Sequence, residues 1–217
     1  MATGKPKPKS LGDEEVRSLL VRYNCPIAFH AVRTRFLGSI ASPETGVSPI
    51  EAVKGLWGGN LPAFDSIESL NELIGALVMG LWNRLAQHQD RKVPFRLLRV
   101  SAPTNRDALA SLALVRHEEL QGFVEGLFGN KEEMDLPERA HHALGELAQI
   151  RGLFKAVQDL YSVSTKPATK SDTAETTQNL RALTKIAEHE IHEAVLSCTK
   201  ARRDVLLGLT TTKPRLH

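Results

Sequence analysis

Two histidines in a charged stretch are the residues whose spacing comes nearest to that of a metal site. His189 and His192 lie within Glu188–Glu193 and are three residues apart. On a helix this spacing places both imidazoles on one face, close enough for a single metal ion. A zinc-protease helix separates its histidines by four residues with a catalytic glutamate between them, and no third ligand is identifiable here. A solvated charged face explains the same residues, so we predict no metal site. A metal-dependent enzyme at His189 and His192 is kept as a second alternative.

No other stretch has the residue types and spacing that catalysis requires. The glycines of 55–59 follow a helical segment and lack the Lys-Ser/Thr pair of a phosphate-binding loop. The nucleophile elbow Gly-x-Ser-x-Gly is absent from the sequence. Cys25 and Cys198 are the only two cysteines, and a free cysteine is usually a small buried hydrophobe. We therefore predict no catalytic residues, no cofactor and no enzymatic activity.

Composition and charge indicate one soluble domain with appendages. The 217 residues are 41% hydrophobic, 24% charged and only 5% aromatic, with a formal net charge of +3. So few aromatic residues offer few platforms for stacking bases. The basic residues are scattered along the chain, and those of the two ends are Lys5, Lys7, Lys9, Lys200, Arg202, Arg203, Lys213 and Arg215. Binding of nucleic acid through these basic termini is an alternative that we do not favour.

The most apolar run, Leu73–Trp82, is ten residues long. A membrane-spanning helix needs about twenty, so this run predicts a buried core helix and no membrane partner. We expect a cytoplasmic protein of bacterial origin.

Nearly every long segment has a helical period, and none alternates as a strand does. Helix starts are marked by capping residues and by proline at the first helical position, at Asp13, Ser48-Pro49, Asp65/Glu68, Thr104/Asp107 and Asp135–Glu138. The sequence therefore predicts an all-α protein, a compact helical bundle plus an additional long C-terminal helix.

Shifts in composition divide the chain into five parts. We expect a basic disordered arm at 1–11, the bundle at 12–161, a polar linker at 162–173, the C-terminal helix at 174–209 and a tail at 210–217. The C-terminal helix carries an apolar stripe that resembles a coiled-coil seam. It either packs back onto the bundle or pairs with another protein or a second copy, as a homodimer. The candidate partner-binding residues are Leu180, Leu183, Ile191 and Val205.

Six residues are expected to mark the fold rather than bind a ligand. Gly122 and Gly126 lie one turn apart, so a neighbouring helix could approach closely. Gly58 and Gly59 permit a turn that a Cβ would obstruct. Trp57 and Trp82 are expected to be core anchors, each with an indole N–H that needs an acceptor.

Three stretches, Ala31–Pro43, Ile50–Ala86 and Leu120–Leu127, resemble the YecA/YgfB family of small all-helical bacterial proteins. The resemblance rests on a Trp-Gly-Gly turn at 57–59, a Trp-Asn pair at 82–83 and a Gly-Phe-x-x-Gly helix at 122–126. It implies a compact bundle without established enzymatic activity. Some members carry a cysteine-rich zinc tail, which this sequence lacks, and another member binds a transcription antiterminator.

The leading hypothesis is therefore a non-enzymatic adaptor or regulatory protein that acts by binding another protein, in transcription or as part of a larger complex.

Overall fold

The computed structural model describes residues 12–101, 103, 105–163 and 170–208, and these form helices and irregular connections without a strand. In chain order the helices are α1 (Asp13–Arg22), α2 (Phe29–Ala41), α3 (Pro49–Gly55), α4 (Ile67–Ile74), a π-helix (Gly75–Trp82), α5 (Asn83–Ala86), a short 3₁₀ helix (Gln87–Gln89), α6 (Arg106–Phe128), α7 (Glu138–Val163) and α8 (Lys170–Leu206). The predicted all-α class is confirmed.

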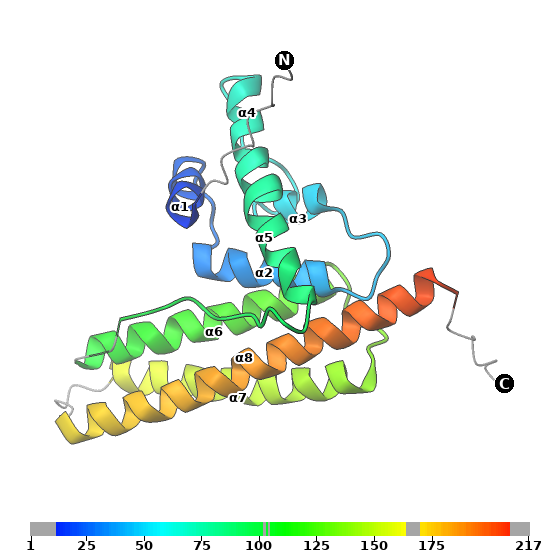
Figure 1. The fold of residues 1–217 in the computed structure, drawn as a ribbon. Coiled ribbons are helices and arrows are strands. Elements are labelled where there is room, and N and C mark those ends of the chain that lie inside the picture. Colours follow the sequence, from blue (N-terminus) through cyan, green and yellow to red (C-terminus); the bar gives the residue numbers. More distant parts are fainter. Residues whose placement is uncertain (1–11, 102, 104, 164–169, 209–217) are drawn as a thin grey trace, which may run out of the picture.

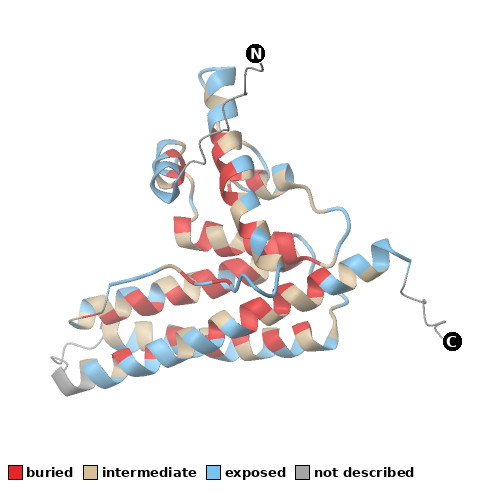
Figure 2. Ribbon diagram, viewed as in Figure 1, coloured by how far each residue is buried: buried red, intermediate tan, exposed pale blue. Residues whose placement is uncertain are grey.

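Three long helices form the body of the molecule (Figure 1). α6, α7 and α8 lie side by side and run alternately in opposite directions, and α2 packs along α6. α1, α3 and the α4–α5 segment stand on the far side of α2. Buried residues concentrate in α2, in α6 and along the middle of α8 (Figure 2). The long C-terminal helix is therefore part of the bundle.

The crossing of α2 and α6 depends on three glycines. A Cβ added at Gly122 would lie 2.7 Å from the carbonyl oxygen of Ala31. A Cβ at Gly126 would overlap the backbone of Arg35, and one at Gly38 would overlap the backbone of α6. The two backbones are thus in direct contact, which confirms the close approach predicted for Gly122 and Gly126. Gly75 and Gly80, in the π-helix, face no such neighbour.

Two predicted capping residues are displaced by one position. Ser66, not Asp65, caps α4, and its hydroxyl accepts a hydrogen bond from the Ser69 amide at 3.2 Å. Asn105 caps α6 by accepting from the Ala108 amide at 2.8 Å, and the predicted Thr104 lies outside the described residues. Ser48 and Pro49 begin α3 as predicted.

Trp57, Trp82 and the glycine turn at 58–59 lie among the helices that precede α6. Trp57 is half-buried, and its indole N–H donates to the Tyr23 carbonyl at 2.9 Å. Trp82 is also half-buried and meets Phe36 edge-on, with ring centroids 5.5 Å apart. Gly58 and Gly59 have φ of 74° and 102°, with open space where a Cβ would be. The turn therefore requires glycine for its backbone conformation and not for lack of room.

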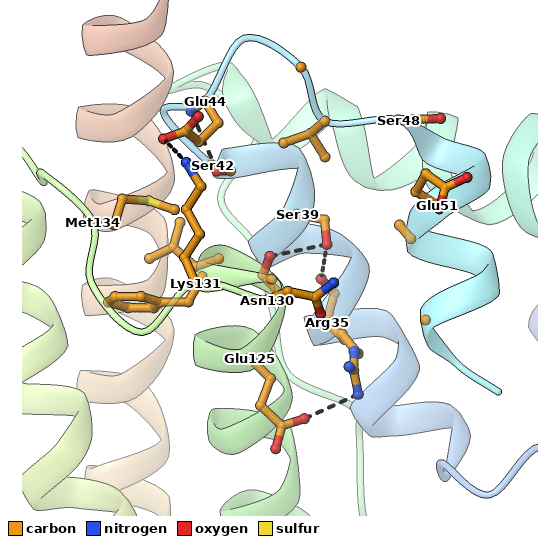
Figure 3. Close-up of a pocket in the computed structure, with 18 of the residues that line it drawn as sticks. Arg35, Ser39, Ser42, Glu44, Ser48, Glu51, Glu125, Asn130, Lys131 and Met134 are labelled. Carbon is orange, nitrogen blue, oxygen red and sulfur yellow. Dashed lines mark hydrogen bonds and ion pairs between the residues drawn. The ribbon is translucent and has the colours of Figure 1, made fainter. Parts of the chain in front are cut away.

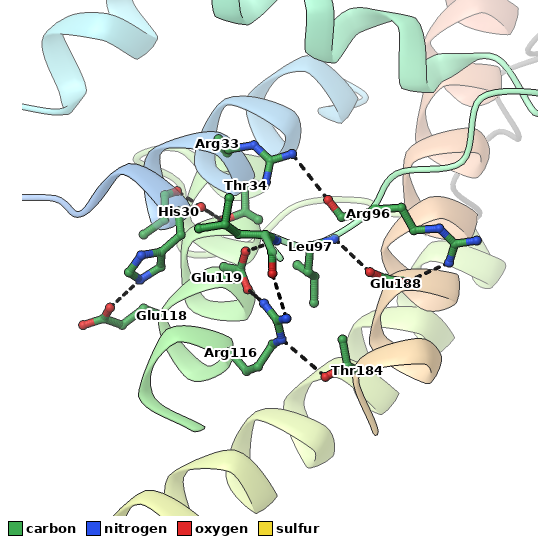
Figure 4. A network of polar contacts seen from close by, with 12 residues as sticks. His30, Arg33, Thr34, Arg96, Leu97, Arg116, Glu118, Glu119, Thr184 and Glu188 are labelled. Atoms are coloured by element: carbon green, nitrogen blue, oxygen red, sulfur yellow. Dashed lines mark hydrogen bonds and ion pairs between the residues drawn. The ribbon is translucent and has the colours of Figure 1, made fainter. Parts of the chain in front are cut away.

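A buried polar network fastens the non-helical connector before α6 (Figure 4). Arg116 and Glu119, both on α6, form a buried ion pair. Arg116 also donates to the Leu98 carbonyl at 2.8 Å, and Glu119 accepts from the Leu98 amide at 2.8 Å. Burial raises the pKa of Glu119, and the Arg116 charge and the Leu98 N–H offset part of that rise. The pair thus replaces the hydrogen bonds that the connector cannot make within itself.

The polar network continues to α2 and α8. The Arg116 guanidinium donates to the Thr184 hydroxyl at 3.3 Å, and Glu188 accepts from the Leu97 amide at 3.0 Å. On the other side, the guanidinium of Arg33 on α2 donates to the Arg96 carbonyl oxygen of the connector at 3.4 Å. The connector therefore links three helices through side chains that the sequence analysis did not single out.

The predicted linker at 162–173 is too long. α7 extends to Val163 and α8 begins at Lys170, so helix occupies both ends of that interval. The remaining residues, 164–169, lie outside the described residues, as do the predicted arm at 1–11 and tail at 210–217. The polar Ser, Thr and Lys residues that indicated a linker are also compatible with helix ends.

Candidate binding site

The apolar stripe of the C-terminal helix is mostly core. Leu180 and Ile191 are fully buried within the chain's own bundle, where α8 packs along α7 and against α6 and α2. These two residues therefore cannot bind a partner in this fold, which corrects the prediction for them. Leu183 is half-buried and lines a shallow apolar groove with Leu153 and Leu160 between α7 and α8. Val205 lies beyond the core and is exposed.

The two histidines of α8 lie in different environments. His189 is largely exposed, whereas His192 is buried and neither of its ring nitrogens has a hydrogen-bond partner. Within the described part of the chain, no group of three or more histidine, cysteine or acidic side chains could hold a metal ion.

Neither cysteine has the environment of a nucleophile. Burial raises the pKa of the half-buried Cys25 thiol, and burial raises the pKa of Cys198 to about 12. A reactive cysteine requires the opposite shift, because the thiolate is the nucleophile.

We expect native protein to react with a thiol reagent only at Cys25, and unfolded protein to react at both cysteines. Because Cys198 stays protonated in the folded state, the unfolded state binds fewer protons once the pH passes the ordinary cysteine pKa of 9.0. The free energy of unfolding should therefore fall as the pH rises above 9.0, and Cys198 should add nothing to its pH dependence below 9.0. Thiol titration with and without denaturant measures the reactivity of the two cysteines. Urea unfolding of wild type and Cys198→Ala across alkaline pH measures the contribution of Cys198 to the pH dependence of stability. Labelling of native Cys198 would contradict the expectation.

A polar pocket of about 590 Å³ lies between α2, α3 and the loop that follows α6 (Figure 3). Its charged side chains are already paired: Glu51 with Lys54 on α3, and the others in two ion pairs across the pocket. Arg35 contacts Glu125 at 3.1 Å, and Lys131 contacts Glu44 at 2.7 Å. The Ser39 hydroxyl lies 3.1 Å from two backbone carbonyl oxygens and not beside a base. The Ser39 hydroxyl therefore lacks the base that would activate it as a nucleophile.

An apolar groove of about 540 Å³ adjoins this pocket on the other side of the same loop. We call it the α6/α7 groove. Its apolar lining comes from α6, from α7 and from the loop between them: Val124, Phe128, Leu136, Leu144, Leu147 and Ala148. Phe128 and Met134 line both the groove and the polar pocket. Gly145 and Ala148 leave the α7 wall low, because a Cβ at Gly145 would meet nothing within 4 Å.

The α6/α7 groove has an acidic rim, formed by Glu132 and Glu133. Both residues are exposed, and neither has an ion-pair partner within the described ranges. The preceding Lys131 is paired with Glu44 and does not neutralise them. On the opposite wall lie His141 and Arg151. The groove thus combines an apolar floor of half-buried and buried side chains with acidic residues along one edge and a histidine and an arginine along the other.

Sequence reasoning did not identify the α6/α7 groove. Leu144 and Ala148 have the helical spacing of core residues, and Glu132 and Glu133 have the composition of an ordinary loop. The available signal was Gly145 and Gly152 on an otherwise regular helix, which indicates a face without large side chains.

The basic residues near the C-terminus do not form one charged surface. Arg202 points inward and donates to the carbonyl oxygens of Ile40 and Ser42 at 2.8 and 2.9 Å. Lys200 and Arg203 are exposed. The other basic candidates, Lys5, Lys7, Lys9, Lys213 and Arg215, lie outside the described residues.

Comparison with known proteins gives no relative: no family model, curated protein or solved structure matches this chain. The resemblance to the YecA/YgfB family stays a prediction that rests on the quoted motifs. In the described part of the chain, none of the helices has the combination of length and apolar character needed to span a bilayer.

Proposed function

We propose that this protein is a non-enzymatic adaptor that acts by binding another protein in the α6/α7 groove. The observation that carries the proposal is a groove of about 540 Å³ with a half-buried apolar floor beside an unpaired acidic rim. Apolar surface left open to water is unfavourable unless something covers it. A groove between two helices is the usual receptor for the apolar face of an amphipathic helix.

The rim defines the charge of the partner. Glu132 and Glu133 would attract Lys or Arg beside the apolar residues of the bound segment, and such pairs contribute to specificity and association rate. The paired charges of the adjoining polar pocket support a binding role over a catalytic one, because no free charge faces a substrate there. The partner is therefore expected to present a basic amphipathic helix.

The proposal is tested by affinity capture from the native host with the Leu144→Glu variant. A carboxylate on the groove floor should reduce recovery of the partner at least tenfold, about 1.4 kcal/mol or more of binding free energy. The matched control is Val21→Glu, which places the same carboxylate on an exposed apolar residue of α1. Circular dichroism confirms that both variants fold. Equal capture by wild type and Leu144→Glu would refute the groove as the binding site.

A further inference from the structure

The C-terminal end of α8 is an exposed apolar tip. Val205, Leu206 and Leu207 follow one another with 51%, 67% and 63% of their surface exposed. α8 ends at Leu206, and Leu207 and Gly208, the latter with φ of 66°, form the turn that follows. We call residues 205–207 the α8 tip. Three consecutive exposed apolar side chains are unusual on a water-facing helix end and indicate a contact surface.

Positive charge accompanies the α8 tip. Lys200 and Arg203 are exposed and three residues apart, and neither has an ion-pair partner within the described residues. The tip thus has the two properties expected of a ligand for the α6/α7 groove, namely large apolar side chains and unpaired basic groups.

The tip cannot occupy the groove of its own chain. Arg202 fixes the last turns of α8 to the end of α2, through the Ile40 and Ser42 carbonyls, and to the side chain of Gln89 at 2.8 Å. No described residue of α8 lines the α6/α7 groove. An α8 tip that enters this groove must therefore come from a second copy of the chain.

We infer that the protein self-associates by placing the α8 tip of one copy in the α6/α7 groove of another. Leu206 and Leu207 cover the apolar floor, while Lys200 and Arg203 face Glu132 and Glu133. The contact joins two different surfaces, so it closes as a reciprocal pair or continues head to tail. This inference rests on the proposed function because it uses the same groove, and self-association then competes with the partner.

Sedimentation velocity of the full chain, from micromolar to sub-millimolar concentration, tests the inference. Wild type should associate as its concentration rises. The double variant Leu206→Glu/Leu207→Glu should weaken association at least tenfold, and Leu144→Glu should do the same from the groove side. Val21→Glu should associate as wild type does. A wild-type protein that stays monomeric throughout, or a tip variant that associates normally, overturns the inference.

A charge exchange tests the pairing itself. Lys200→Glu/Arg203→Glu should weaken association, and so should Glu132→Lys/Glu133→Lys. Mixing the two variants should restore association between them, because opposite charges again face each other. Failure of the mixture to associate more strongly than either variant alone overturns the assigned orientation.

The experiments can refute self-association and partner binding independently of each other. If the tip variant is monomeric and still captures the host partner, both the inference and the proposed function stand. If wild type is monomeric while Leu144→Glu loses the partner, only the self-association is wrong. If Leu144→Glu loses self-association but captures everything that wild type captures, the groove serves the second copy and the proposed function is wrong.

Discussion

Gly126→Ala should destabilise the protein by about 3 kcal/mol or more, at the upper end of what overpacking a core causes. The added Cβ would overlap the backbone of Arg35, which cannot rotate away as a side chain could. Relief requires α2 and α6 to separate along their whole crossing, and that would also loosen the Arg35–Glu125 ion pair. Urea unfolding followed by circular dichroism measures the loss.

Gly152→Ala is the matched control for this experiment. Gly152 is also a helix glycine, but it is exposed on α7 and a Cβ there would meet nothing within 4 Å. Alanine should therefore stabilise the protein by about 0.5–1 kcal/mol through its higher helix propensity. If both substitutions shift the urea midpoint in the same direction, the close α2–α6 contact is not what the glycine provides.

Glu119→Leu should cost about 3–5 kcal/mol, the range observed when one partner of a buried ion pair is removed. The substitution leaves the Arg116 charge buried without its carboxylate and the Leu98 amide without an acceptor. Adding Arg116→Met to Glu119→Leu removes the unpaired buried charge, and this double variant should recover only part of the lost stability. The Leu98 carbonyl and the Thr184 hydroxyl would then each lose the guanidinium that contacts them.

A double-mutant cycle over Arg116 and Glu119 measures their coupling. The exposed pair Lys155–Asp159, on α7, is the control, because both side chains are about half exposed. Lys155→Met should change the free energy of unfolding by about 0.5 kcal/mol or less. Additive effects at Arg116 and Glu119 would show that the two residues do not act as a pair.

Local patterns predicted the features of this fold that depend on single helices. The helical period gave the all-α class, and the spacing of Gly122 and Gly126 indicated a close helix crossing. The cap positions were displaced by one residue because Ser66 and Asn105 are as suitable for capping as their neighbours Asp65 and Thr104. Such choices depend on the direction from which the preceding chain enters the helix.

Features made by two distant segments were beyond the reach of periodicity. Arg116 and Glu119 have the spacing of an ordinary surface pair, and they are buried only because the connector and α8 pack against them. Leu180 and Ile191 have the spacing of a seam, which packs equally well on another chain or on its own bundle. The α6/α7 groove is defined by the lack of a covering element, and no single helix carries that information.

The α2–α6 crossing has a consequence for synthesis of the chain on the ribosome. Arg35 and Glu125 are separated by 90 residues, so α2 is made long before the helix that covers it. At roughly 5–20 residues per second, the face of α2 that carries Ala31, Thr34 and Gly38 waits roughly 5–20 s for α6 to emerge. The opposite face waits for less time, because Trp82, the partner of Phe36, is made before α6. Until α6 emerges, the first long helix of the nascent chain therefore has one uncovered face that is open to chaperone capture.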